Sequence, residues 1–296
     1  MDNKLFMPPI RLILNSQCNG KCMFCHNEGN ERHEEMPQHI IEECIKAAEE
    51  LPISKIALTG GEPTLRNDLP DIINRIKEHG KILVSLTTNG YNLKNIIHSL
   101  IEPIDNINLS IISLKNEVAM KYQNVDPSMM LEVLCSVPAR NRNLNIVVIE
   151  DNYLEIDQFI EWGIKTSTSV DLMFLDRKDE EYKSIQKNII NRLINAKGGE
   201  ILLNATPVLK IDMGNGCILR IKTPFLSGLL YNGICESCGD NKECFEKICA
   251  IRVHPNGLVT PCLKQKICLE GENTFEKIKN TYYYLQDMTI ANDFVE

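Results

Sequence analysis

The sequence predicts an α/β fold: a partial (β/α)6 TIM-like barrel followed by a small β-rich, cysteine-rich C-terminal domain. Six short apolar runs alternate with stretches of helical periodicity, which is typical of βαβ units with parallel strands. After residue 199 the segments become short and rich in glycine, which favours strands on irregular loops. Six of the twelve cysteines lie between residues 235 and 268, so we expect metal to help hold this region together.

The expected elements follow one another along the chain in strand–helix order. The first strand covers residues 10–14, and the helical pattern after it begins at Met36 and places Cys44 on its apolar face. Further strands are expected at 55–58, 82–86, 107–111, 144–149 and 170–175. Helical patterns cover 69–76, 153–162, 180–196 and 274–285. We therefore expect two domains, residues 1–199 and 200–296.

Composition limits the classes of protein that fit this chain. Its 296 residues are 43% hydrophobic and 24% charged, as in ordinary globular proteins. No run approaches the roughly 18 uncharged apolar residues of a membrane span, and the first nine residues do not resemble a signal peptide. We therefore expect a cytoplasmic protein. The net charge of −8 disfavours non-specific nucleic-acid binding, which needs a basic surface.

Three cysteines, Cys18, Cys22 and Cys25, follow the first strand with the spacing C-x3-C-x2-C. The carboxyl ends of parallel strands are where such folds place their chemistry. Three thiolates on one short loop suit an iron–sulfur cluster, in which one iron would keep an open position, or zinc, for which His26 could be a fourth ligand. A disulfide is disfavoured in the reducing compartment expected here.

The segment Thr59-Gly60-Gly61-Glu62-Pro63-Thr64 follows the second predicted strand. Its glycines let a ligand approach the backbone, and Glu62 offers a carboxylate to a cationic group. Together with the cysteine loop, this motif resembles the radical S-adenosylmethionine (SAM) superfamily. The resemblance implies that Cys18, Cys22 and Cys25 bind a [4Fe-4S] cluster. The methionine part of SAM would chelate the open iron, and the segment with Gly60, Gly61 and Glu62 would hold the SAM amino group.

The same resemblance implies a mechanism that depends on the cofactors more than on acid–base side chains. An electron from a ferredoxin- or flavodoxin-type donor would cleave SAM to methionine and a 5′-deoxyadenosyl radical, and the radical would abstract hydrogen from the substrate. The protein would position SAM and exclude water. We therefore predict no acid–base catalytic residue for this first step.

Most of the chain is similar to the GTP 3′,8-cyclase family of molybdenum cofactor biosynthesis. By that resemblance Thr88, Ser110 and Asn145 would contact SAM. Arg11, Lys55 and Arg252 would face a triphosphate. Some substrate positions differ, because Ala57 and Ala250 stand where the family has arginines and Asn143 stands where it has a lysine. Each lost cation removes a phosphate contact of about 1.5–3 kcal/mol, so we expect a related architecture with a different substrate.

The hairpin at residues 251–263 is similar to hairpins of the cyclase family and of the SPASM and twitch domains. By that resemblance Cys235, Cys238 and Cys262 would hold a second, auxiliary [4Fe-4S] cluster. The interval between Cys238 and Cys262 is longer than in the cyclase family, so Cys244, Cys249 and Cys268 are further candidate ligands. On local spacing alone, structural zinc remains an alternative.

Three functions follow from these patterns. The first is a cyclase-like radical SAM enzyme acting on a nucleotide or another small anion. The second is a radical SAM enzyme of the SPASM or twitch type that modifies a peptide. The third, from a different class, is a non-catalytic zinc-binding module.

Overall fold

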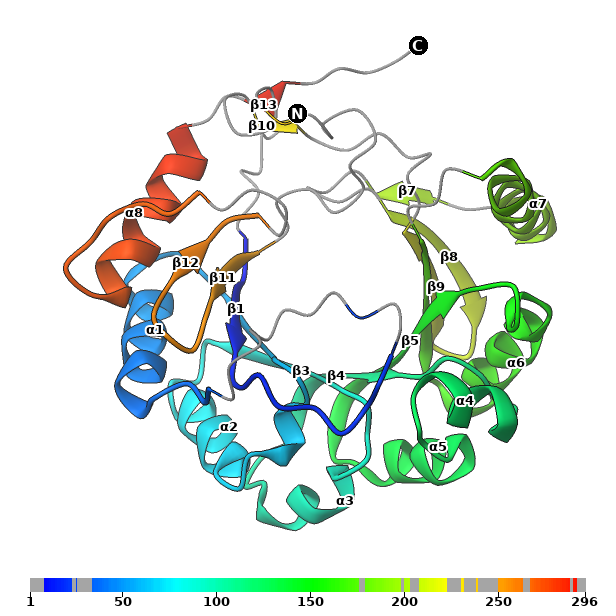
Figure 1. Ribbon diagram of the computed structural model, residues 1–296, viewed down its shortest axis with the longest axis horizontal. Coiled ribbons are helices and arrows are strands. Elements are labelled where there is room, and N and C mark those ends of the chain that lie inside the picture. Colours follow the sequence, from blue (N-terminus) through cyan, green and yellow to red (C-terminus); the bar gives the residue numbers. More distant parts are fainter. Residues whose placement is uncertain are drawn as a thin grey trace.

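The computed structural model describes residues 8–22, 25, 34–175, 179–197, 200–202, 208–222, 230–231, 238, 250–262, 267–287 and 290–291. Within these residues the chain forms an eleven-stranded sheet whose order is β12-β11-β1-β2-β3-β4-β5-β6-β9-β8-β7. Figure 1 shows the strands lining the inside of a ring and the helices packed around its outside. The predicted partial barrel is confirmed.

The strands of the barrel sheet are β1 (Ile10–Ile13), β2 (Lys55–Thr59), β3 (Leu83–Thr88), β4 (Ile104–Ser110), β5 (Ala139–Val148), β6 (Ser169–Phe174), β7 (Glu200–Leu202), β8 (Val208–Gly214), β9 (Cys217–Lys222), β11 (Ile251–Val253) and β12 (Val259–Thr260). Two further short strands, β10 (Leu230–Tyr231) and β13 (Ile290–Ala291), pair with each other. The α-helices are α1 (Gln38–Glu50), α2 (Leu69–Glu78), α3 (Leu93–Ile96), α4 (Asn116–Tyr122), α5 (Pro127–Ser136), α6 (Ile156–Thr166), α7 (Glu180–Lys197) and α8 (Thr274–Asp287).

Strands β1 to β6 are parallel and pair in chain order, as βαβ units with outer helices require. Two later segments extend this sheet at its edges. Strand β9 pairs in parallel with β6, and β11 pairs in parallel with β1 although it lies about 240 residues further along the chain. The glycine-rich C-terminal region therefore contributes strands to the barrel sheet itself. The predicted domain boundary lies between residues 199 and 200. Residues 198 and 199 are outside the described residues.

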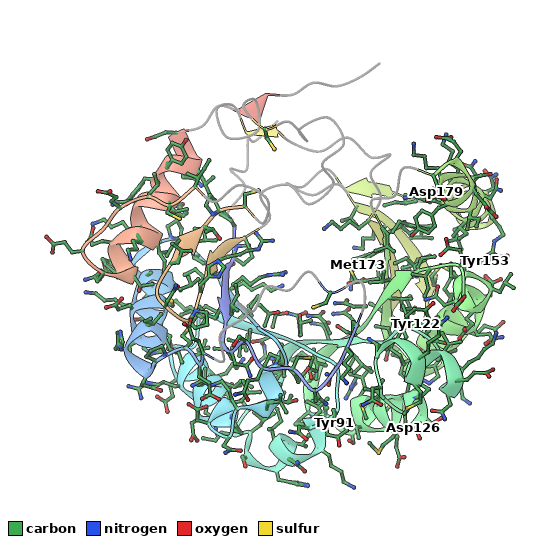
Figure 2. The ribbon with its side chains drawn as sticks, in the orientation of Figure 1. Tyr91, Tyr122, Asp126, Tyr153, Met173 and Asp179 are labelled. Atoms are coloured by element: carbon green, nitrogen blue, oxygen red, sulfur yellow. The ribbon has the colours of Figure 1, made fainter. Side chains whose placement is uncertain are left out.

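Alternation along the strands separates an apolar outer face from a polar inner face. The outer face of β6 carries the buried residues Val170, Leu172 and Phe174, which belong to the hydrophobic core under the helices. Met173 lies on the inner side of the ring in Figure 2, and Asp171, two residues earlier on the same strand, shares its face. On β6 the inner face therefore carries Asp171 and Met173.

Cys44 is fully buried in α1, as predicted for a core residue. No helix among the described residues has the length and apolar character that crossing a bilayer requires.

Candidate active site at the carboxyl ends of the strands

The cysteine loop and the glycine motif are joined by backbone hydrogen bonds where β1 and β2 end. Gly61 N–H donates to Asn15 O at 2.8 Å, and Glu62 N–H donates to Gln17 O at 2.7 Å. The Asn15 side-chain amide donates to Glu62 O at 2.9 Å. The two motifs that are separated in sequence therefore form one layer, with Cys18 directly after the residue that pairs with Glu62.

Both glycines are required by this close approach. A Cβ on Gly60 would lie 2.5 Å from the side-chain oxygen of Asn15, and a Cβ on Gly61 would overlap the carbonyl oxygen of Gln17. From the sequence we expected this space to admit a ligand. On this side of the motif it is filled by the backbone of the cysteine loop.

Glu62 connects the ends of β2 and β3 through its carboxylate. Oε1 accepts from Thr88 Oγ1 at 2.6 Å and from the hydroxyl and N–H of Thr64, while Oε2 accepts from Asn89 N–H at 2.7 Å. Burial raises the pKa of Glu62, against the lowering effect of these four hydrogen bonds. Glu62 is only 2% exposed, and its four hydrogen bonds hold the motif in place.

The three thiols of the loop lie close enough to influence one another. Burial raises the pKa of Cys22 to about 11, with Cys25 and Cys18 adding to the rise, and a hydrogen bond from Gln123 opposes it. Burial also raises the pKa of Cys18, whose Sγ accepts from Gly20 N–H at 3.3 Å. Because burial disfavours the thiolates of Cys18 and Cys22, a bound cation would be needed to stabilise them.

The donor set of this loop fits an iron–sulfur cluster. Cys18, Cys22 and Cys25 offer three soft thiolate ligands from one loop, and zinc could use the same donors. Among the described residues no three His, Cys, Asp or Glu side chains are grouped to hold a single metal ion. Cys18 and Cys25 are exposed and Cys22 is half-buried. His26 lies outside the described residues.

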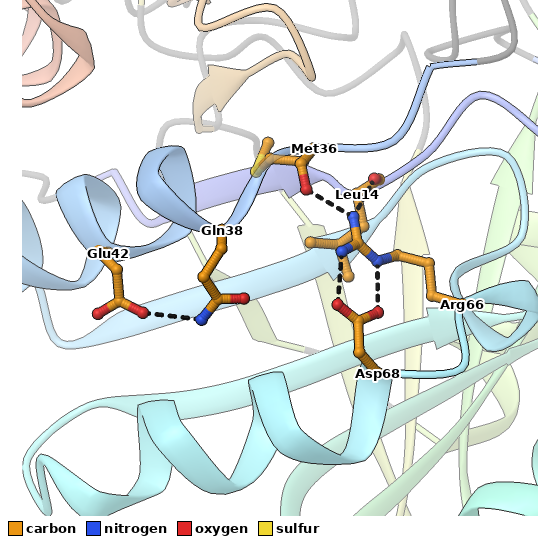
Figure 3. Close-up of polar contacts among 6 residues, drawn as sticks. All are labelled: Leu14, Met36, Gln38, Glu42, Arg66 and Asp68. Carbon is orange, nitrogen blue, oxygen red and sulfur yellow. Dashed lines mark hydrogen bonds and ion pairs between the residues drawn. The ribbon is translucent and has the colours of Figure 1, made fainter.

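Arg66 holds the two ends of the cysteine loop together. Its Nη1 donates to Leu14 O at 2.9 Å and to Met36 O at 2.8 Å, on either side of residues 15–35 (Figure 3). Asp68 binds the other side of the guanidinium with two hydrogen bonds of 2.9 and 2.8 Å. The loop therefore leaves and re-enters the barrel at one fixed point.

The other predicted SAM contacts lie next to this layer. Thr88 is 2% exposed, donates to Glu62 and accepts from Gly90 N–H at 2.9 Å. Ser110 and Asn145 are register partners on β4 and β5, and both are half-buried. Gln123 connects Ser110 to the cysteine loop, since it donates to Ser110 O at 3.3 Å and to Cys22.

The three predicted substrate residues face the barrel interior from neighbouring strands. Arg11 is the register partner of both Arg252 on β11 and Ala57 on β2. Lys55 lies close enough to Arg11 that the guanidinium, after burial, contributes to lowering its pKa. The structure therefore brings Arg11, Lys55 and Arg252 to one side of the barrel.

The candidate ligands of the auxiliary cluster are only partly described. Cys235, Cys244 and Cys249 lie outside the described residues. Cys262 is buried after β12, Cys238 is half-buried and Cys268 is exposed. Their grouping around one cluster stays a prediction.

Four residues of the site were not predicted from the sequence: Gln123, Asn89, Arg220 and Asp171. Asn89 donates to Asn19 within the cysteine loop at 2.9 Å, and Arg220 forms a salt bridge of 2.6 Å with Asp171 inside the barrel. On β6, Asp171 and Met173 alternate with buried apolar residues. This pattern could have predicted that the Asp171 carboxylate faces the inside of the barrel. Gln123 gave no such signal, because it lies just after a short helix far along the chain from the cysteines.

Comparison with known proteins agrees with these motifs. The sequence model of the radical SAM superfamily matches residues 12–163, just over half of the chain. A probable GTP 3′,8-cyclase of Thermococcus kodakarensis is 37% identical over 181 residues, and the match covers 58% of this chain and 58% of that protein. A probable GTP 3′,8-cyclase of Thermoplasma volcanium is 27% identical over 250 residues, covering 77% of this chain and 74% of that protein.

Solved structures share the fold at low sequence identity. Streptococcus suis SuiB bound to precursor peptide SuiA superposes with a TM-score of 0.66 at 16% identity, covering 94% of this chain and 65% of SuiB. Native anSMEcpe with bound AdoMet and the Cp18Cys peptide gives a TM-score of 0.57 at 17% identity, covering 93% of this chain and 80% of anSMEcpe. Against the Thermococcus protein and SuiB, the chain spans less than two thirds of the partner's length.

Proposed function

Because the chain belongs to the radical SAM superfamily, we propose that it is an iron–sulfur enzyme that reductively cleaves SAM and abstracts a hydrogen atom from a small anionic substrate. The observation that carries this proposal is the pairing of Gly61 and Glu62 with Asn15 and Gln17. It sets the three-cysteine loop beside the Gly-Gly-Glu-Pro motif.

Cys18, Cys22 and Cys25 would hold a [4Fe-4S] cluster at the carboxyl ends of β1 and β2. With SAM bound, this cluster would supply the electron for the reductive cleavage of SAM. The chain's own residues position the reactants. Glu62, Thr88 and Asn89 fix the motif that would receive SAM, and Gln123 fixes the position of Cys22. The ordered strand ends would aim the radical at one C–H bond and keep out water.

The small anionic substrate is supported by Arg11, Lys55 and Arg252 inside the barrel, and by the similarity to probable GTP 3′,8-cyclases. A peptide substrate is the alternative suggested by the similarity of the 251–263 hairpin to SPASM and twitch domains, while SuiB, at 16% identity, shares only the fold. We infer a ferredoxin- or flavodoxin-type donor from the need for a low-potential electron. We also propose an auxiliary [4Fe-4S] cluster held by Cys235, Cys238 and Cys262, with Cys244, Cys249 and Cys268 as further candidates.

Anaerobic reconstitution of the full chain tests this function. Iron and sulfide are counted, and 5′-deoxyadenosine is measured with SAM and a chemical reductant. We expect roughly four irons for one cluster or eight for two, and 5′-deoxyadenosine formation that is lost in Cys22→Ser. The matched control is Cys135→Ser, because Cys135 is exposed on α5. Zinc in place of iron, or no 5′-deoxyadenosine from protein with its full iron content, would refute the proposal.

The triple variant Cys18→Ser/Cys22→Ser/Cys25→Ser isolates the auxiliary cluster. If that cluster exists, this variant keeps roughly four irons per chain, and adding Cys238→Ser and Cys262→Ser removes them. A triple variant without iron would refute the second cluster and leave the first intact.

A further inference from the structure

Gln123 connects the cysteine loop to the end of β4. It directly follows α4 and is 3% exposed. Its N–H donates to Ala119 O at 2.8 Å, and Asn124 N–H donates to the same carbonyl at 3.1 Å. Asn124 has φ +58°, the left-handed conformation that often ends a helix. The end of α4 therefore fixes the backbone of Gln123, and its side chain is enclosed by the protein.

The hydrogen-bond partners of the Gln123 amide fix its orientation. Oε1 accepts from Ile112 N–H at 2.8 Å, and Nε2 donates to Ser110 O at 3.3 Å. A flipped amide would set its N–H groups against the Ile112 N–H and its oxygen against the Ser110 carbonyl, so one orientation satisfies both partners. The second hydrogen on Nε2 is then available to the sulfur of Cys22, which forms a hydrogen bond with this side chain.

The cysteine loop packs against the same segment. A Cβ on Gly20 would lie 3.6 Å from Gln123 O and 3.7 Å from Asn89 Nδ2, at ordinary van der Waals distance from both. Asn89 also donates to Asn19 Oδ1 at 2.9 Å. The loop is thus held between the end of β3 and the end of α4, which keeps the Cys22 sulfur within reach of Gln123.

A hydrogen bond to a ligand sulfur changes the reduction potential of an iron–sulfur cluster. Reduction adds one negative charge, part of which lies on the ligand sulfurs, so a donor stabilises the reduced form more than the oxidised form. A buried amide is screened little by water and acts strongly. At Cys22 a neutral donor would therefore favour uptake of the electron without adding a charge.

We propose that Gln123 is a positioning residue that raises the reduction potential of the first cluster through its N–H···S hydrogen bond to Cys22. The inference rests on the proposed function in taking Cys22 as a cluster ligand, and it adds how readily that cluster accepts an electron. Since the same amide binds Ser110 O, it also holds the end of β4 in a fixed position beside Cys22.

Potentiometric titration of the reconstituted full chain, followed by electron paramagnetic resonance, tests this role. The signal to follow is the one that Cys22→Ser alters, which separates it from the signal of an auxiliary cluster. Gln123→Met keeps the length of the side chain and removes the donor. We expect its reduction equilibrium constant to fall about tenfold, a shift of about 59 mV to lower potential for one electron. Gln123→Asn withdraws the amide by one methylene and should shift the potential in the same direction.

Asn152→Ala is the matched control, because Asn152 supports the same strand end without touching the cysteine loop. It is 1% exposed, accepts from Ile149 N–H at 2.8 Å, and donates to Ile112 O at 2.6 Å and to Val147 O at 2.9 Å. Both Asn152→Ala and Gln123→Met remove a buried hydrogen bond to the backbone of Ile112, so a merely structural effect would appear in both. The potential of Asn152→Ala should equal that of the wild type.

Four results would overturn the proposal: a reduction equilibrium constant within twofold of the wild type in the Gln123 variants, a higher potential in them, an equal shift in Asn152→Ala, or loss of the cluster from both Gln123 variants. A wild-type chain without any cluster would refute this proposal and the proposed function together, and the iron count shows that before a potential is measured. A lowered potential in a chain that does not cleave SAM would refute the proposed function alone.

Discussion

Arg66 is a single side chain on which the geometry of the cysteine loop depends. It is 5% exposed and supplies the donors for Leu14 O and Met36 O. Arg66→Gln should lower the free energy of unfolding by about 2–4 kcal/mol, because two buried carbonyls lose a charged donor. Arg75→Gln removes an exposed ion pair with Glu42 and should cost less than about 1 kcal/mol. Urea unfolding of both variants checks this, and equal losses would contradict the role given to Arg66.

Gly61 tests the contact between the two motifs at the scale of one methyl group. Gly61→Ala would place a Cβ against Gln17 O, so the loop must move and the chain should retain less than half of the wild-type iron. Gly80→Ala is the matched control, since Gly80 has φ +57° and no atom lies within 4 Å of the position that its Cβ would take. It should cost about 1 kcal/mol of backbone strain and leave the iron content unchanged. Wild-type iron in Gly61→Ala would show that the loop tolerates displacement.

Asp105 connects four elements at the amino ends of the strands. From β4 its Oδ2 accepts from Lys77 of α2 and from Val84 N–H of β3, both at 2.8 Å, and Oδ1 lies 3.4 Å from Arg140 of β5. Burial acts to raise the pKa of Asp105, but the Lys77 and Val84 hydrogen bonds and the nearby cations outweigh it and hold the pKa below its usual range. The carboxylate therefore stabilises the fold above the unfolded-state pKa of about 4.

Because the folded-state pKa is the lower one, that stabilisation is lost as the pH falls through it. Asp105→Asn should cost about 2–4 kcal/mol at pH 7, and its difference from the wild type should shrink between pH 5 and pH 3. Asp157→Asn, which breaks an exposed pair, should differ by less than about 1 kcal/mol at every pH. Urea unfolding across this pH range checks the prediction. A difference for Asp105→Asn that does not change with pH would contradict it.

The elements that sequence alone located are those with apolar residues on the helix-facing side. Strand β5 begins at Ala139, earlier than the predicted start at residue 144. Its first residues are mostly polar and partly exposed, so they show no apolar pattern that would predict a strand. Strand β4 begins three residues before its expected start, for the related reason that Asp105 and Asn106 interrupt the apolar run. Helices α4 and α5 were not predicted, since the first is short and the second has a weakly amphipathic pattern. An apolar sequence pattern therefore predicts the strand residues that pack against helices. It does not predict strand residues that face the polar interior of the barrel.

At the scale of the whole molecule, the same limit applies to the site. The cysteine loop and the Gly-Gly-Glu-Pro motif could be read because their chemistry lies in consecutive residues. Arg220 could not be, because its proximity to Lys55 and Asn143 depends on β9 adding to the sheet beside β6. That pairing brings together residues far apart in the chain, and no local pattern encodes it.

The core and the cysteine loop occupy different parts of the molecule, which predicts how the chain behaves without iron. Core residues such as Ile10, Leu58 and Phe159 are fully buried between the sheet and its helices, whereas Cys18 and Cys25 are exposed. The barrel should therefore keep its secondary structure when the iron is chelated. The far-UV circular dichroism spectrum should change little, and the thermal transition should stay cooperative. The midpoint temperature should fall only by the amount that cluster binding adds to the stability of the folded state. The variant Cys22→Ser/Cys238→Ser/Cys262→Ser, which removes ligands of both proposed clusters, should match the chelated wild type, and Cys135→Ser should match the loaded one. A chelated chain that loses its transition, as small metal-dependent domains do, would mean that the cluster is needed for folding as well as for chemistry.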